Sequence, residues 1–201
     1  MGENVNPWVT RPPLEETPDQ DHTVPDDAPA ATGPQSPQGG VPFPGDDDRL
    51  PRRRVSGTAH VWFLGVHGGA GESTLAGLVP DARPAGHAWP EVANPPGHAP
   101  ARVVLVARTH ASGLRSAQLA ATEWASGSVS GIELIGLVLV ADAPGKLPRP
   151  LKDMAKVIKG GVPRTWSIPW IESWRLNEPV DVQRSPKSVR SMIADLDALS
   201  H

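Results

Sequence analysis

His60-Val-Trp-Phe-Leu-Gly-Val-His-Gly-Gly-Ala-Gly-Glu-Ser-Thr-Leu-Ala76 has the layout of a phosphate-binding loop between a strand and a helix. The apolar run at residues 61–66 predicts a buried strand. The glycines that follow, Gly68, Gly69 and Gly71, allow a tight turn whose main-chain N–H groups point inward. Ser73 and Thr74 then open a helix, so this stretch predicts a strand–loop–helix unit.

The charge of this loop is reversed at one position. A nucleotide-binding loop places a lysine before its Ser/Thr pair, and here that position is Glu72. A carboxylate about 4 Å from a phosphate charge is repelled by about 4 kcal/mol at an effective dielectric constant near 20, where lysine would be attracted equally. Glu72 is either a helix-start acid, favourable by about 0.3–1 kcal/mol, or the partner of an arginine or of Lys146 that fills the loop internally.

Composition separates a tail from a folded domain. Residues 1–54 hold 11 of the 24 prolines and have a net charge of −5, whereas residues 55–201 have a net charge of +2. We therefore expect a disordered, acidic, proline-rich tail at 1–54 and one α/β domain at 55–201. Neither charge is large enough to indicate a nucleic-acid partner.

The chain contains no cysteine, which excludes disulfides and cysteine-based metal sites. Its apolar runs are far shorter than the roughly 18 residues that span a bilayer, and residues 1–30 lack the basic start and apolar stretch of a secretion signal. We expect a cytoplasmic protein without a membrane span. Fourteen arginines against five lysines are typical of a GC-rich bacterial genome.

From residue 59 onward, apolar runs alternate with amphipathic segments, which is the βαβ pattern. The passage 80–100 contains six prolines, and we expect no regular structure there. The pattern predicts an α/β three-layer sandwich with a mainly parallel sheet of about four strands. The expected strands are 61–66, 102–107, 134–141 and 164–168, and the later helices are 112–126, one opened by Pro148 and Pro150, and one capped by Ser185.

The carboxyl ends of parallel strands meet at one edge of a sheet, where ligands bind. We therefore expect the glycine loop to lie beside Arg108 or Asp142, with Lys146 and residues 169–175 on the same edge. Trp166, Trp170 and Trp174 are spaced by four and would either cover the sheet edge or form a partner surface. Lys152, Lys156 and Lys159 share one face of a helix and are expected to face water.

The loop His67-Gly-Gly-Ala-Gly-Glu-Ser-Thr74 resembles the deviant Walker A loop of the ParA/MinD family, Lys-Gly-Gly-x-Gly-Lys-Ser/Thr-Ser/Thr. The resemblance extends over most of residues 59–175 and implies a P-loop NTPase-like fold. Three departures stand out. His67 and Glu72 replace the two lysines; only 28 residues, 75–102, remain where the family has two strands with a Walker B aspartate; and Asp142 replaces a base-recognising Asn. The wider sequence also resembles an uncharacterised group of bacterial P-loop-like proteins.

The resemblance and its departures predict a non-hydrolysing P-loop module, a pseudo-ATPase that serves as a scaffold or partner-binding protein without a cofactor. The alternative is a nucleotide-binding switch with weak ATPase activity, which would bind ATP with magnesium through Arg108 or Lys146 in place of the lost lysines. We expect an unidentified protein partner or a homodimer, no metal site and no catalytic residue. The predicted binding residues are Gly68, Gly69, Gly71, Glu72, Ser73, Thr74, Arg108, Asp142 and Lys146.

Overall fold

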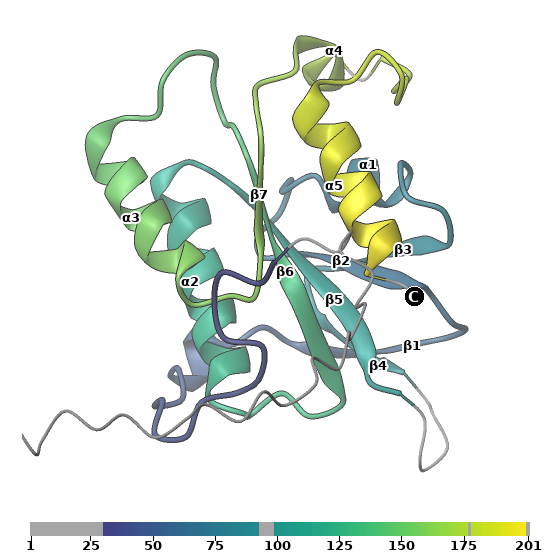
Figure 1. The fold of residues 1–201 in the computed structure, drawn as a ribbon. Coiled ribbons are helices and arrows are strands. Elements are labelled where there is room, and N and C mark those ends of the chain that lie inside the picture. Colours follow the sequence, from purple (N-terminus) through teal and green to yellow (C-terminus); the bar gives the residue numbers. More distant parts are fainter. Residues whose placement is uncertain (1–29, 93–98, 177, 200–201) are drawn as a thin grey trace, which may run out of the picture.

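A five-stranded, fully parallel sheet forms the centre of the molecule (Figure 1). The computed structural model describes residues 30–92, 99–176 and 178–199. Its strand order is β3-β2-β5-β6-β7. The strands are β2 (Val61–Gly65), β3 (Ala82–Gly86), β5 (Ala101–Arg108), β6 (Ile132–Val140) and β7 (Thr165–Ile168). The expected α/β class with a mainly parallel sheet is confirmed, with five strands in place of about four.

Helices cover both faces of this sheet. Helices α2 (Ala111–Ala125) and α3 (Arg149–Lys159) bury Leu114, Trp124 and Ile158 against one face. Helices α1 (Glu72–Ala76) and α5 (Lys187–Ala198) bury Leu75 and Met192 against the other. The short helix α4 (Glu172–Arg175) follows β7, and one 3₁₀ turn spans Asp46–Asp48. The three-layer arrangement is thus present.

The expectation of no regular structure at 80–100 is wrong for the described part of that passage. It forms β3 and a further strand, β4 (Trp89–Val92). Strand β3 lies at the sheet edge, where Pro84 can occupy a strand without breaking a ladder between two neighbours. Prolines therefore did not exclude strands here. Residues 93–98 lie outside the described residues.

Regular structure is also present upstream of residue 54, within the segment expected to be a tail. Strand β1 (Arg52–Val55) pairs in parallel with β4 in a small two-stranded sheet. Further upstream, the N–H groups of Thr32 and Gly33 donate to the carbonyl oxygen of Pro163, at 2.9 and 3.3 Å. Parts of the segment 30–54 therefore contact the folded domain. Leu50, for example, packs against its core. The rest of the expected tail, residues 1–29, lies outside the described residues.

A buried carboxylate joins this N-terminal segment to the core. Glu123 of α2 is 2% exposed. Its Oε2 atom accepts hydrogen bonds from the Leu50 N–H at 3.1 Å and from the Trp89 indole N–H at 2.9 Å. One acid thus holds the N-terminal segment, β4 and α2 together, a role that we did not predict for it.

The order of the strands fixes where a ligand crevice can form. After β2 the chain passes through α1 to β3, on one side of β2. After β5, which lies on the other side of β2, the chain passes through α2 to β6, further in that opposite direction. The connections therefore diverge at the carboxyl ends of β2 and β5. In open parallel sheets this divergence opens the crevice in which ligands bind.

Candidate functional site

A small polar cavity of about 380 Å³ lies at this point of divergence. We call it the glycine-loop cavity. Segments that follow β2, β5, β6 and β7 all contribute to it, so the expected convergence of the four strand ends is found. The lining residues are His67, Gly68, Gly69, Arg108, His110, Asp142, Trp170 and Arg175.

His67, at the start of the glycine loop, is fixed by main-chain contacts. Its Nε2 accepts a hydrogen bond from the N–H of Arg108 at 3.0 Å, so Nε2 carries no proton. Its Nδ1 lies 3.0 Å from the carbonyl oxygen of Gly68, to which it then donates. Burial lowers the pKa of His67 below its ordinary value of 6.5, outweighing the bond to Gly68 that raises it. The side chain is therefore a neutral structural link.

His110 lies next to His67, with ring centroids 4.9 Å apart. Its Nδ1 accepts the N–H of Gly113 at 2.9 Å and thereby caps the start of α2. A side chain at Gly113 would collide with the Arg108 carbonyl oxygen and approach both histidine rings. The two histidines and Gly113 thus form a tightly packed wall of the cavity.

Arg108 supplies a half-buried cation to the cavity. Its guanidinium donates to the carbonyl oxygen of Ala141 at 3.1 Å. Burial lowers its pKa, Asp142 opposes this shift, and nearby Arg175 adds to it. Asp142 is exposed, and its main-chain N–H is held by the Thr109 hydroxyl at 3.1 Å. Two arginines thus face one carboxylate across this cavity.

The structure separates the predicted loop residues. Gly68 and Gly69 line the cavity, but Gly71, Glu72, Ser73 and Thr74 do not. Gly69 and Gly71 adopt φ angles of 72° and 106°, which the turn requires and glycine tolerates. The Glu72 carboxylate folds back against Gly65, where a Cβ atom would overlap with it. No ion pair of Glu72 occurs within the described part of the chain, so an arginine or Lys146 does not fill the loop there.

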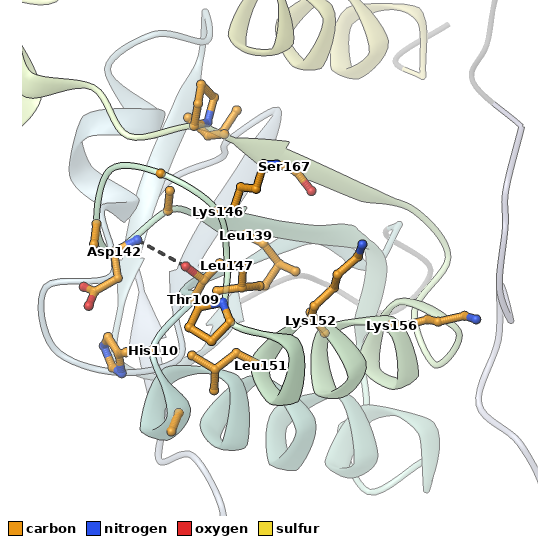
Figure 2. Close-up of a pocket in the computed structure, with 18 of the residues that line it drawn as sticks. Thr109, His110, Leu139, Asp142, Lys146, Leu147, Leu151, Lys152, Lys156 and Ser167 are labelled. Atoms are coloured by element: carbon orange, nitrogen blue, oxygen red, sulfur yellow. Dashed lines mark hydrogen bonds between the residues drawn. The ribbon is translucent and has the colours of Figure 1, made fainter.

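A second, larger cavity of about 840 Å³ lies beside the first, between residues 141–148, α3 and the end of β7 (Figure 2). We call it the lysine cleft. Leu139, Leu147 and Leu151 lie in its middle. Lys146 belongs to this cleft and not to the glycine-loop cavity, and Asp142 lines both.

The three lysines of α3 line this cleft, and the expectation that they face water holds for Lys152 and Lys156. Lys152 and Lys156 are exposed, and Lys159 donates to the Ser167 hydroxyl at 3.1 Å. Figure 2 shows Lys152 pointing from α3 towards the strand that carries Ser167. Their helical spacing predicted a shared face. It could not predict that residues 141–148 stand opposite that face.

The three tryptophans lie in different surroundings, and only Trp166 is buried on the edge strand of the sheet. Trp166 is buried on the edge strand β7 and donates to Asp195 of α5 at 2.8 Å. Trp174 packs partly against the same core. Trp170 lines the glycine-loop cavity and donates to Glu172 at 2.6 Å.

The described residues offer neither a metal-binding cluster nor a membrane-spanning helix. No group of three or more His, Cys, Asp or Glu side chains there could hold a metal ion. Among the helices of residues 30–92, 99–176 and 178–199, none has the length and apolar character needed to cross a membrane.

Comparison with known proteins places the chain in one family. Neither the curated proteins nor the solved structures gave a match. A model for a family of unknown function, DUF6668, matches residues 59–193. This match covers the central sheet from β2 to β7 and most of α5, but not β1 or the N-terminal segment. The chain belongs to the DUF6668 family of unknown function.

Proposed function

We propose that this protein is a non-hydrolysing, ParA/MinD-like P-loop module that serves as a scaffold or partner-binding protein. The observation that carries the proposal is the placement of Glu72. It stands in the lysine position of the loop, and its carboxylate folds back against Gly65. An acid there repels a triphosphate, as the sequence predicts.

The surrounding residues do not fit a magnesium–triphosphate group either. Ser73, the position of a magnesium ligand, is exposed and does not line the cavity. Helix α1 behind the loop has only five residues. Strand β3, which neighbours the loop strand, ends at Gly86 and is followed by His87. A Walker B aspartate, which holds magnesium in P-loop NTPases, is therefore absent from the end of this strand.

Binding of a partner is the role that the carboxyl edge of the sheet supports best. The lysine cleft combines apolar side chains with cationic side chains on one open surface. Apolar contact with a charged rim is the usual composition of a recognition surface. The edge that carries nucleotides in P-loop proteins would here carry a protein segment.

Calorimetric titration tests the proposal. ATP, ADP and GTP are added to the full chain, each with and without magnesium. We expect no saturable heat with any nucleotide. Saturable binding that requires magnesium and disappears in Ser73→Ala would contradict it.

A second candidate function, the nucleotide-binding switch, has one observation in its favour. Arg108 and Arg175 both reach the glycine-loop cavity and could neutralise a phosphate in place of the missing lysines. In this case Arg108→Gln would abolish nucleotide binding, whereas Lys146→Gln, in the lysine cleft, would leave it unchanged.

A further inference from the structure

We propose that the lysine cleft binds the acidic N-terminal segment of the same chain, residues 1–29. We call this segment the acidic tail. The inference deepens the proposed function, because it names the surface that binds a protein segment and the chemistry of that segment. It rests on the charge of the cleft, the composition of the tail and the point where the chain enters the fold.

The cleft carries an excess of positive charge. Four of the five lysines in the chain line it, against two aspartates, Asp142 and Asp153. Asp153 already lies 3.9 Å from Arg149. In the described residues no acidic side chain pairs with any of these lysines, which are Lys146, Lys152, Lys156 and Lys159.

The acidic tail has the complementary composition. It contains seven acids and one arginine, Arg11, which gives a net charge of −6 with His22 neutral. It also contains Trp8, Val9 and Leu14, which suit the leucines in the middle of the cleft. Its acids are Glu3, Glu15, Glu16, Asp19, Asp21, Asp26 and Asp27.

The tail joins the fold at one end of the cleft. Thr32 and Gly33 donate to Pro163, which lies in the connection from α3 to β7 just beyond Lys159. Gly33 lies so close to this connection that a Cβ atom would overlap with the Val162 carbonyl oxygen. The first described residues are therefore fixed beside the helix that carries three of the cleft lysines.

The dimensions allow the acids to reach these lysines. The 11 residues of α3 extend about 16 Å. Ten residues of extended chain, such as 20–29, span at most about 36 Å. Each exposed ion pair contributes about 0–1 kcal/mol, so several are needed together. Attachment to the same chain supplies the tail at an effective concentration of about millimolar for a short linker.

Paramagnetic labelling of the full chain tests the inference. Because the chain has no cysteine, a nitroxide can be attached at one engineered site, Gln20→Cys. We expect the amide NMR signals of residues 143–156 to lose most of their intensity, and those of α5, on the opposite face, to keep theirs. Salt at about 1 M, where the Debye length is about 3 Å, should restore the lost signals. Equal effects on both faces, or none, would overturn the inference.

Two controls define the surface and the source of the tail. Lys152→Glu with Lys156→Glu should restore the lost signals, whereas Lys187→Glu on α5, the fifth lysine, should not. In a second control, chains that carry the nitroxide but no isotope label are mixed with isotope-labelled chains that carry no nitroxide. Signal loss in this mixture would show that the tail binds a second copy and would overturn the inference. Nucleotide titration is independent of these readouts, so failure here is distinguishable from failure of the proposed function.

Discussion

The Nε2 atom of His67 accepts the main-chain N–H of Arg108 at 3.0 Å and so ties the glycine loop to the end of β5. This bond exists only while His67 is neutral, because a protonated imidazole has no acceptor. A histidine of the glycine loop thus makes a structural contact with the end of the adjacent strand.

The lowered pKa of His67 predicts a pH dependence of stability. The unfolded chain binds the His67 proton below about pH 6.5, whereas the folded chain resists it until a lower pH. The unfolded state then carries more protons between these two pKa values. The contribution of His67 to stability is therefore fully present above about pH 6.5 and is lost as the pH falls towards the lower pKa of the folded state. We expect urea unfolding midpoints to fall less between pH 7.5 and 5.5 in His67→Gln, which keeps an acceptor. Identical declines in both proteins would argue against this role.

Glu123→Ala should destabilise the fold strongly. It removes the acceptor of the Leu50 N–H and the Trp89 indole N–H in a buried site. A buried donor left unpaired costs about 1–3 kcal/mol, so we expect a loss of at least about 2 kcal/mol in the free energy of unfolding. Glu178→Ala, at an exposed acid, should change it by less than about 0.5 kcal/mol. Equal effects in denaturant titrations would contradict the assignment.

Gly113→Ala should strain the wall of the glycine-loop cavity. The added Cβ would meet the carbonyl oxygen of Arg108 and the rings of His67 and His110. Overpacking of this kind costs about 1–3 kcal/mol. Gly77→Ala is the control, because its Cβ would make ordinary contacts at 3.5 Å, and it should be neutral or stabilising by about 0.4–1 kcal/mol. Thermal melts that rank the two variants in reverse would show that the wall is not tightly packed.

Much of the fold could be predicted, because buried parallel strands leave continuous apolar runs. The run at 102–107 became β5 and the run at 134–141 became β6, each within two residues. Strands β1, β3 and β4 were missed, because short edge strands need neither apolar runs nor freedom from proline. The convergence of Arg108 and Asp142 on the glycine loop followed from parallel topology alone.

Other features depend on tertiary contacts that no local pattern encodes. Glu123 in a helix is typical of a solvent-facing position, and only the approach of Leu50 and Trp89 shows why it is buried. The helical spacing of Lys152 and Lys156 defines a face but not what stands opposite it. Sequence reasoning therefore identified the loop and its edge, and missed both the buried acid and the cleft.

The most direct test of the non-hydrolysing loop is nucleotide binding and turnover by Glu72→Lys beside the wild type. The substitution replaces repulsion of phosphate by attraction, and the loop glycines with Arg108 and Arg175 remain in place. We expect ATP affinity to rise in calorimetry without phosphate release, and neither in the wild type. Glu133→Lys makes the same charge change at the start of β6 and should gain nothing. Magnesium-dependent ATP turnover by the wild type, lost in Ser73→Ala, would contradict the proposal and favour the switch.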